Sequence, residues 1–452
     1  MKKTSTIRRT AKPPTTYQPP RQTMSLSNAF TIVELLVVTV VIGILAAITI
    51  VSYTGISQKA VVSSLQSDLG SAKKQLSLYY VDHGSYPTSI NTGTGNDNCP
   101  TPTDSNYCLK SSSGNAYTYL PNNTTNATDY SLYASNSSNS SLYYRISTTT
   151  ALSSALTIVT PCPYGFIVVP GSSTYSTSDF CVMKYNAKAD NGSGVGDTSQ
   201  TTGSNTWPAN AYPISASHKL VSTAAGYPVA NISQTTAIAN ASNATYVAGC
   251  STCHLITEAE YLTIAQNVLN NPINWSSGTV GTGYIYNGHV NNNPATALEA
   301  SANDSDGLYG ITGGTGNGSG YNNRRTLTLS NGEVIWDLAG NVWEWTSGTS
   351  TTGQPGITGE VAYAWKQYTA VTATGTLSQN VLPSGTGISG ANTWTSTNGI
   401  GLLYSNAGET GLRGFIRGGI WGHGSRAGVL FLALSSSPGG TSADVGFRVA
   451  RP

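Results

Sequence analysis

The sequence predicts an α+β protein: a long amino-terminal helix packed on a small antiparallel sheet, followed by a large glycine-rich domain that mixes strands and helices. Two observations predict this order. Apolar residues keep a helical period from residue 30 to about residue 82, and Gly84 and Pro87 then supply the stop signals. Beyond residue 155, tryptophan appears and motifs at fixed spacing begin.

The small sheet is expected to follow the helix directly, and the carboxy-terminal half of the helix should pack on it. Its candidate strands are Ala116–Leu120, Ser131–Ala134 and Leu142–Ile146. Residues 150–156 form a Ser/Thr-rich linker. The sequence therefore predicts one domain over residues 30–149 and a second over residues 157–452.

Charge is scarce and unevenly placed. Only 9% of the 452 residues are charged, against the usual quarter, and the net charge is +2. Residues 1–29 hold six basic residues and no acidic ones. This pattern excludes an acidic solvating tail and argues against a nucleic-acid partner. With 38% hydrophobic residues, 8 Trp and 26 Tyr, the chain can fill a sizeable core, so global disorder is excluded.

Residues 30–51 read FTIVELLVVTVVIGILAAITIV, long enough to cross a ~30 Å hydrocarbon core as a helix. We therefore expect a transmembrane helix at about residues 30–52, with the basic arm in the cytoplasm. The run continues into an amphipathic helix instead of a cleavage site, which argues against a secretory signal peptide. Glu34 is the anomaly, because a carboxylate in lipid costs roughly 3 kcal/mol and so needs a partner or a function.

The segment NAFTIVELLVV, residues 28–38, resembles the processing site of type IV prepilins and pseudopilins. The resemblance implies that a prepilin peptidase removes residues 1–29 by cutting between Ala29 and Phe30, and that it methylates the new amino terminus. Glu34 would then neutralise the terminal amine of a neighbouring subunit. Ala29 departs from the family pattern, which usually has Gly, and Met24 is an alternative start.

The same resemblance implies partners and a location. The partners are other pilin subunits, the peptidase and the inner membrane. The location is the cytoplasmic membrane and then a pilus or pseudopilus at the cell surface. Residues 30–149 resemble a small pseudopilin-type domain, in which a disulfide between Cys99 and Cys108 would staple a loop.

The six cysteines fall in close pairs along the chain, which together with the membrane-targeting segment favours disulfides in an oxidising compartment. A bridge between Cys162 and Cys181 would tie a hairpin at the start of the large domain. Cys250 and Cys253 form a CxxC pair without the βαβ context of a redox motif. A structural disulfide or plain thiols are favoured for this pair, and the choice between them stays open.

Four motifs of the large domain follow in a fixed order. They are a helix start at Thr257–Glu260, WDLAGNVWEW at residues 336–345, IRGGIW at residues 416–421 and VGFRVAR at residues 445–451. Together they resemble the formylglycine-generating-enzyme-like (sulfatase-modifying-factor) family over residues 160–452. This resemblance implies a modified C-type-lectin fold, with few helices, irregular sheet and much ordered loop.

The resemblance also implies a Ca²⁺ site, since calcium prefers a mixture of carboxylate and carbonyl oxygens. Its ligands would be the side chains of Asp337 and Glu344 and the carbonyls of Gly340 and Val342. The alternative is that the two carboxylates only cap turns around a tryptophan core.

Enzymatic activity is not expected. Catalytic members of that family use two cysteines near the final GFR segment to bind copper and oxidise a substrate cysteine. This sequence has no cysteine between Arg417 and Pro452, and its five histidines contain no pair at i,i+3 or i,i+4.

Residues 417–451 resemble the variable region of proteins diversified by diversity-generating retroelements. Such systems reach NNY codons, which exclude Lys, Glu, Gln, Met and Trp, and residues 422–445 contain none of these five. The candidate variable positions, which share no chemistry, are Ile420, Gly422, His423, Arg426, Phe431, Ala433, Ser435, Ser436, Gly439, Gly440, Ser442, Ala443 and Asp444. They should be mostly exposed on one surface, above buried Trp421, Val429, Leu432, Leu434, Val445 and Phe447.

These expectations predict a surface-displayed, pilin-anchored, adhesin-like protein with a hypervariable lectin-fold face that binds an extracellular protein or glycan. A structural minor pseudopilin of a secretion system is the alternative. A formylglycine-generating-type oxidase is a third possibility, against which the missing cysteines argue.

Overall fold

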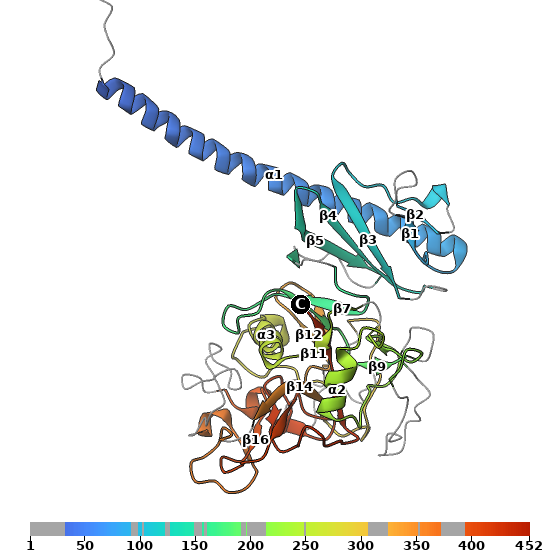
Figure 1. Ribbon diagram of the computed structural model, residues 1–452, viewed down its shortest axis with the longest axis vertical. Helices are drawn as coiled ribbons and strands as arrows, with labels where there is room; N and C mark the ends of the chain where they lie inside the picture. Colours follow the sequence, from blue (N-terminus) through green and yellow to red (C-terminus); the bar gives the residue numbers. More distant parts are fainter. Residues whose placement is uncertain are drawn as a thin grey trace, which may run out of the picture. The chain divides into compact units, whose positions relative to one another are not determined.

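The computed structural model describes residues 32–91, 98–101, 104–122, 127–148, 156–157, 161–190, 196, 214–247, 250–305, 324–350, 353–371 and 394–452 (Figure 1). Ala29 and Phe30 of the expected processing site lie outside these residues. Glu34 lies in the first helix, and its side chain is not among those described.

Helix α1 spans Ile32–His83. Its carboxy-terminal half buries Leu65, Leu69, Ala72 and Leu76, whose spacing of three and four residues puts them on one face. Among the described residues, no helix combines the length and the apolar character needed to cross a membrane. The span expected at about residues 30–52 therefore gains no support from the structure.

The buried face of α1 packs on a four-stranded antiparallel sheet in the order β3-β4-β5-β6 (Figure 1). The strands are β3 (Asn115–Pro121), β4 (Tyr130–Asn136), β5 (Asn139–Ser147) and β6 (Leu156–Thr157). A small pair, β1 (Ile90–Asn91) and β2 (Cys99–Pro100), lies beside the 3-10 helix η1 (Ser105–Tyr107). We call residues 61–157 the small domain.

The expected linker over residues 150–156 is wrong at its last residue. Leu156 belongs to β6 and pairs with Tyr143 of β5, so the small sheet gains a strand from the segment that was expected to leave it. Residues 150–155 lie outside the described part of the chain.

The large domain contains a four-stranded antiparallel sheet in the order β11-β20-β8-β7. Its strands are β7 (Phe166–Val169), β8 (Phe180–Met183), β11 (His254–Leu255) and β20 (Val449–Arg451). The first and last strands of the domain thus share one sheet. Two helices accompany it, α2 (Gln234–Ala241) and α3 (Glu258–Leu269), and α3 begins with the expected capping box of Thr257 and Glu260.

A six-stranded mixed sheet in the order β15-β16-β18-β17-β14-β19 forms the other half of the large domain. Its strands are β14 (Trp343–Ser350), β15 (Ala364–Lys366), β16 (Leu403–Ser405), β17 (Arg413–Arg417), β18 (Leu432–Ala433) and β19 (Val445–Phe447). Smaller elements are β9 (Lys188–Ala189), β10 (Leu220–Val221), β12 (Thr326–Thr328), β13 (Val334–Trp336), η2 (Pro272–Asn274), η3 (Tyr368–Ala370), η4 (Ser396–Asn398) and η5 (Gly424–Arg426).

The six-stranded sheet separates two cores. Leu403 and Leu432 pair across β16 and β18 and face the core that contains α3. Their neighbours Tyr404 and Ala433 pair in the same register and face the other core, which contains α2 and which we call the second core. Alternate residues of each strand point to opposite faces, so adjacent residues of one strand serve different cores.

The small domain is joined to the large domain by buried side chains. Arg145 of β5 forms an ion pair with Glu333, and its Nη1 donates to the carbonyl of Phe166 at 2.9 Å. The Tyr133 hydroxyl donates to the carbonyl of Cys162 at 3.3 Å, and the Tyr133 ring belongs to the second core of the large domain. The two sheets therefore belong to one packed body.

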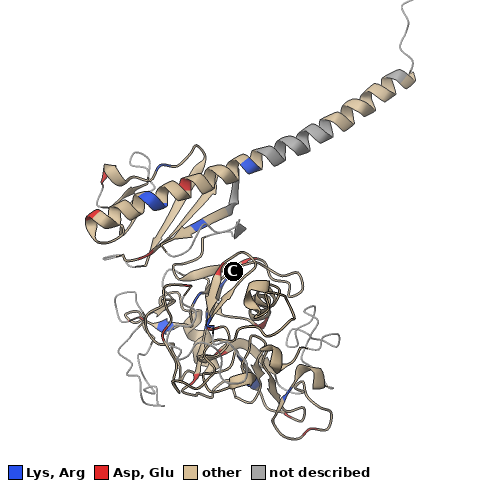
Figure 2. Ribbon diagram, turned by 180° about the vertical axis from the view of Figure 1, so that it is seen from behind, with Lys and Arg blue, Asp and Glu red and all other residues tan. Residues whose placement is uncertain are grey.

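Charged residues are sparse in the described part of the chain (Figure 2), yet several are buried. Four arginines are at most 4% exposed, and each forms an ion pair with a carboxylate. The pairs are Arg145–Glu333, Arg325–Asp337, Arg417–Glu258 and Arg448–Glu344. A buried guanidinium must have such a partner, because burying an isolated charge is very costly.

Candidate functional site

Three of the expected calcium ligands, Asp337, Gly340 and Val342, lie in the turn between β13 and β14, and the fourth, Glu344, lies in β14. The backbone there is left-handed at three residues, with φ of 53° at Asp337, 81° at Gly340 and 65° at Asn341. Non-glycine residues adopt this conformation uncommonly, and Asp and Asn tolerate it best. The turn brings the Asp337 and Asn341 side chains together, with the Asn341 amide nitrogen 3.2 Å from Oδ2 of Asp337.

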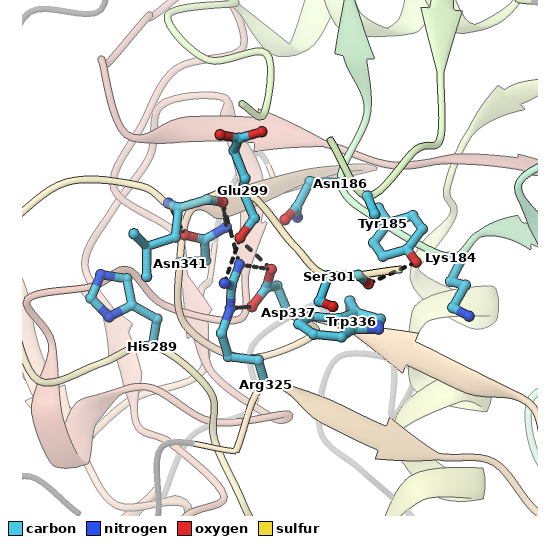
Figure 3. Close-up of polar contacts among 12 residues, drawn as sticks. Lys184, Tyr185, Asn186, His289, Glu299, Ser301, Arg325, Trp336, Asp337 and Asn341 are labelled. Atoms are coloured by element: carbon cyan, nitrogen blue, oxygen red, sulfur yellow. Dashed lines mark hydrogen bonds and ion pairs between the residues drawn. The ribbon is translucent and has the colours of Figure 1, made fainter. Parts of the chain in front are cut away.

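Arg325 forms an ion pair with the Asp337 carboxylate (Figure 3). Its Nε lies 2.7 Å from Oδ1 and its Nη2 lies 2.6 Å from Oδ2, which is a bidentate pair. The Arg325 Nη1 also donates to the carbonyl of Glu299 at 2.6 Å. The Arg325 side chain is 0% exposed and the Asp337 side chain 3%, so this pair is sealed from solvent.

Glu344 forms an ion pair with a different arginine, Arg448. Its Oε1 and Oε2 accept from Nε of Arg448 at 2.9 and 3.2 Å, and Oε1 also accepts from the Asn186 amide at 2.6 Å. Burial raises the pKa of the Glu344 carboxyl, and the Arg448 guanidinium opposes this rise without cancelling it. The Arg448 Nη1 in turn donates to the carbonyls of Met183 and Lys184.

This arrangement does not fit the expected calcium site. Calcium needs oxygens that converge on one point, whereas Asp337 and Glu344 each turn their oxygens to a separate guanidinium. Within the described ranges, no three His, Cys, Asp or Glu side chains are grouped as a metal site would require. Asp337 and Glu344 act as buried counter-ions of Arg325, which precedes β12, and of Arg448, which precedes β20.

All six cysteines are in disulfides. The bonds join Cys99 to Cys108, Cys162 to Cys181, and Cys250 to Cys253. The first two are the expected pairs, and the third decides the open choice in favour of a disulfide. Cys250 and Cys253 are 4% and 6% exposed, so this bond lies in the protein interior.

The candidate variable positions mostly reach the surface. Eleven of the thirteen residues are exposed or half-buried, and Gly422, Arg426, Gly439 and Ser442 are the exposed ones. Of the residues expected beneath them, Val429, Leu432, Leu434, Val445 and Phe447 are all at most 1% exposed.

Three positions differ from the expectation. Phe431 is 0% exposed and Ala433 is 2% exposed, because both face the second core, where Ala433 lies in β18 between β16 and β17. Trp421 was expected to be buried and is half-buried instead. Phe431 is therefore not an exposed contact anchor but a buried ring beneath the surface.

The main chain of the candidate variable segment is held by backbone groups that lie outside the segment. The carbonyl of Arg426 accepts from the amide of Leu402 at 2.9 Å, and that of Ser436 accepts from Gly414 at 2.8 Å. Further along, the carbonyl of Ser442 accepts from Asn231 at 3.0 Å and that of Asp444 from Trp343 at 2.9 Å. These bonds use backbone atoms only, so they do not depend on which side chain occupies positions 426, 436, 442 or 444.

Both ends of the segment are anchored by buried arginines. Arg417 precedes it and forms an ion pair with Glu258 of α3, and Arg448 follows it and forms the ion pair with Glu344 of β14. Both arginines are 0% exposed. The RGG and GFR motifs of the sequence thus fix the two ends of the segment in the core.

Aromatic side chains from outside the candidate variable segment meet it at one place. The ring of Trp365 (β15) lies 4.4 Å from Tyr404 (β16) and 5.4 Å from His423, centroid to centroid. The ring of His423 lies 5.1 Å from Trp343 (β14), and that of Tyr404 lies 5.5 Å from Tyr363. We call these five half-buried rings the aromatic strip: Tyr363, Tyr404, Trp365, His423 and Trp343.

The buried Phe431 ring packs against the strip. Its centroid lies 5.7 Å from that of Trp365, 5.3 Å from that of His423 and 6.3 Å from that of Trp343. The guanidinium of Arg426 lies over the Trp365 ring, 5.1 Å from its centroid. Burial and then the nearby Arg426 charge lower the pKa of His423 to about 4, so its imidazole is neutral near pH 7.

Sequence reasoning found His423, Arg426 and Phe431 but missed Tyr363, Tyr404, Trp365 and Trp343 as parts of the same surface. Trp343 lies within the WDLAGNVWEW motif, where it reads as a core tryptophan. The other three belong to short segments 12 or more residues before the candidate variable region. No pattern distinguishes them from core aromatics until the sheet pairs β15 with β16 and β16 with β18.

The comparisons with known proteins found curated relatives of one short segment of the chain and solved structures that align with a larger part of it. No family model matches the chain. The chain is 34% identical over 71 residues to a fimbrial protein of Neisseria meningitidis, which covers 16% of this chain and 41% of that protein. It is 35% identical over 62 residues to type II secretion system core protein G of Dickeya chrysanthemi, covering 14% of this chain and 40% of that protein.

A type IV major pilin protein of Neisseria gonorrhoeae is 34% identical over 71 residues, covering 16% of this chain and 42% of that protein. The chain thus spans about two fifths of the length of the curated relatives it matches. Among solved structures, Treponema denticola variable protein 1 is 17% identical with a TM-score of 0.29, covering 64% of this chain and 94% of that one. A Major Tropism Determinant variant is 14% identical with a TM-score of 0.22, covering 64% of this chain and 52% of that one.

The similarity over about 70 residues relates one segment of the chain to type IV pilins and pseudopilins.

Proposed function

We propose that the chain is a subunit of a type IV pilus or pseudopilus that displays a ligand-binding face on its large domain. The similarity to pilins and pseudopilins supports the first half of this proposal. The second half rests on one observation. The candidate variable positions mostly keep their side chains at the surface while backbone hydrogen bonds hold their main chain in place.

In this arrangement, the side chains that maintain the fold are different from the side chains that are available for binding. Surface substitutions away from special features usually change stability by less than about 0.5 kcal/mol, whereas truncations in the core cost several kcal/mol. The buried residues Val429, Leu432, Leu434 and Phe447 maintain the fold. Side chains such as those of Arg426 and Ser442 are then free to change, which is what an adhesin with a diversified binding face needs.

Processing tests the pilin half. Mass spectrometry of the native protein should find a methylated Phe30 at the amino terminus. Glu34→Gln should reduce incorporation into filaments, because an uncharged side chain cannot neutralise the terminal amine of a neighbouring subunit. Lys110→Gln, a change at an exposed residue of the small domain, is the control and should leave incorporation unchanged. An intact leader in mature filaments would contradict this half of the proposal.

Binding tests the other half. Purified full-length protein should bind members of a peptide array or of a glycan array. A triple variant, Gly422→Asp, Arg426→Asp and Ser442→Arg, should lose that binding while keeping its melting temperature. Binding that survives in the triple variant, or no binding to either array, would favour the alternative of a structural minor pseudopilin.

Diversification itself can be read in the DNA beside the gene. A near-copy of the segment that encodes residues 417–451, differing only at adenines, should lie beside a reverse-transcriptase reading frame. Its absence would leave an ordinary binding domain with an invariant face.

A further inference from the structure

The aromatic strip indicates the class of ligand, on the premise that the proposed binding function is correct. The strip and its surroundings combine Trp, Tyr and Arg, which are the residue types enriched at the energetic centres of protein–protein interfaces. Three of its five rings, those of Trp343, Trp365 and Tyr404, belong to strands outside the candidate variable segment. They would be present whatever the variable positions encode.

The rings are turned toward one another. Trp365 and Tyr404 lie 4.4 Å apart with their planes 31° from parallel, and the Arg426 guanidinium lies over the Trp365 ring. Trp343 and Trp365 each meet the His423 ring edge to face, at 65° and 82°. A sugar ring binds an aromatic side chain by stacking on an open face, so this arrangement favours a ligand that contacts ring edges and fills the spaces between side chains.

The strip adjoins exposed apolar residues. Successive ring centroids from Tyr363 to Trp343 are 5.5, 4.4, 5.4 and 5.1 Å apart, so each ring contacts the next. Val361, 88% exposed, lies two residues before Tyr363. Leu412, 48% exposed, precedes Arg413, whose Nε donates to the Tyr363 hydroxyl at 3.3 Å.

Arg426 supplies the charge at the middle of the strip. Its side chain is exposed, and it forms no ion pair with any residue that the structure describes. Its contact with Trp365 restricts where the guanidinium can lie. A guanidinium held in this way matches a carboxylate, which it can bind through two parallel hydrogen bonds.

We propose that the aromatic strip docks a polypeptide segment of its partner, which places apolar or aromatic side chains along the rings and a carboxylate on Arg426. The constant rings provide contact area for any such segment. The side chains at positions 423 and 426 choose among segments, so diversification of these two positions changes the partner without rebuilding the surface.

The test uses full-length protein and an array of seven-residue peptides. Each peptide carries two aromatic or leucine residues and one Asp, and is paired with a copy in which that Asp is Asn. The wild-type protein should bind a subset of the Asp peptides at least tenfold more tightly than their Asn copies. Arg426→Glu should abolish this preference and favour copies that carry Lys instead. Trp365→Ala should weaken binding to Asp and Asn peptides alike by tenfold or more.

Lys110→Glu is the matched control, because it reverses an exposed positive charge on the small domain. It should leave the peptide preference unchanged, and thermal melting should show that all three variants are folded. Since Arg426 is exposed, its variant keeps the test valid even if Trp365→Ala unfolds. Binding confined to a glycan array and lost in the triple variant would overturn this inference while leaving the proposed function intact. Equal binding of Asp and Asn peptides, or an equal effect of Lys110→Glu, would also overturn it.

Discussion

Replacing Asp337 by Asn tests whether this buried carboxylate is a counter-ion or a calcium ligand. The substitution keeps the size of the side chain and removes its charge. Arg325 would then be left 0% exposed without its carboxylate partner, and one of its N–H groups would face the new amide NH₂ group. The carbonyls of Glu299 and Leu298, which Arg325 also contacts, carry no charge to compensate.

The expected loss follows from the burial of the pair. Removing one partner of a buried ion pair typically costs 3–5 kcal/mol, on the order of a third or more of the stability of an ordinary domain. Urea denaturation of the full-length protein should show this as a lower midpoint for Asp337→Asn. The control is Lys110→Gln, which removes a charge from an exposed side chain of the small domain and should shift stability by less than about 0.5 kcal/mol.

A chelator separates the two roles of Asp337. A calcium ion at a hundredfold excess over its Kd would add about 2.7 kcal/mol to the native state, and EDTA would remove that contribution. Because the two carboxylates are paired with Arg325 and Arg448, we expect EDTA to leave the urea midpoint of the wild-type protein unchanged. An EDTA effect that is present in the wild type and absent in Asp337→Asn would refute the counter-ion reasoning.

Three further outcomes follow from the same structure. Arg145→Met should cost about 3–5 kcal/mol in urea denaturation because it strands Glu333 in the contact between the domains, and adding Glu333→Met should restore most of the loss. Burial lowers the pKa of His254 but its carboxylate partner raises it more, so the net pKa lies above its ordinary value. That stabilising contribution is complete below about pH 6.5 and disappears as pH rises through the folded pKa, so His254→Gln should flatten the decline in stability that begins above about pH 6.5. Phe431→Ala should cost about 3–5 kcal/mol, whereas Ser442→Asn should cost less than about 0.5 kcal/mol, and equal costs would contradict the division into core and surface.

Local signals in the sequence were sufficient for individual elements. The capping box of Thr257 and Glu260 fixes the start of α3, and the three expected strands of the small sheet lie within β3, β4 and β5. The lack of shared chemistry among the candidate variable positions separated most surface residues of the segment from core residues. It failed at Ala433 of β18 and at the neighbouring Phe431, because a strand in the middle of a sheet covered on both faces has no solvent-exposed face.

The sequence did not predict which distant residues form ion pairs or which strands become neighbours. Asp337 and Glu344 lie in a motif whose spacing fits metal ligands. Their ion-pair partners are Arg325, which is 12 positions from Asp337, and Arg448, which is 104 positions from Glu344. The aromatic strip depends in the same way on which strands become neighbours. A sequence shows that a buried carboxylate needs a cation, and only the fold shows that the cation is an arginine.

The position of β20 has a consequence for how faulty chains are removed. This strand lies between β11 and β8, and Arg448 immediately before it closes the ion pair with Glu344. If residues 420–444 are diversified as we propose, any frameshift within them would remove an inner strand and leave Glu344 buried without its arginine. Such a chain cannot complete its core, so it should be degraded by proteases and not displayed with a damaged face. Under the proposed diversification, the position of β20 after the variable segment would let folding select the copies that kept their reading frame.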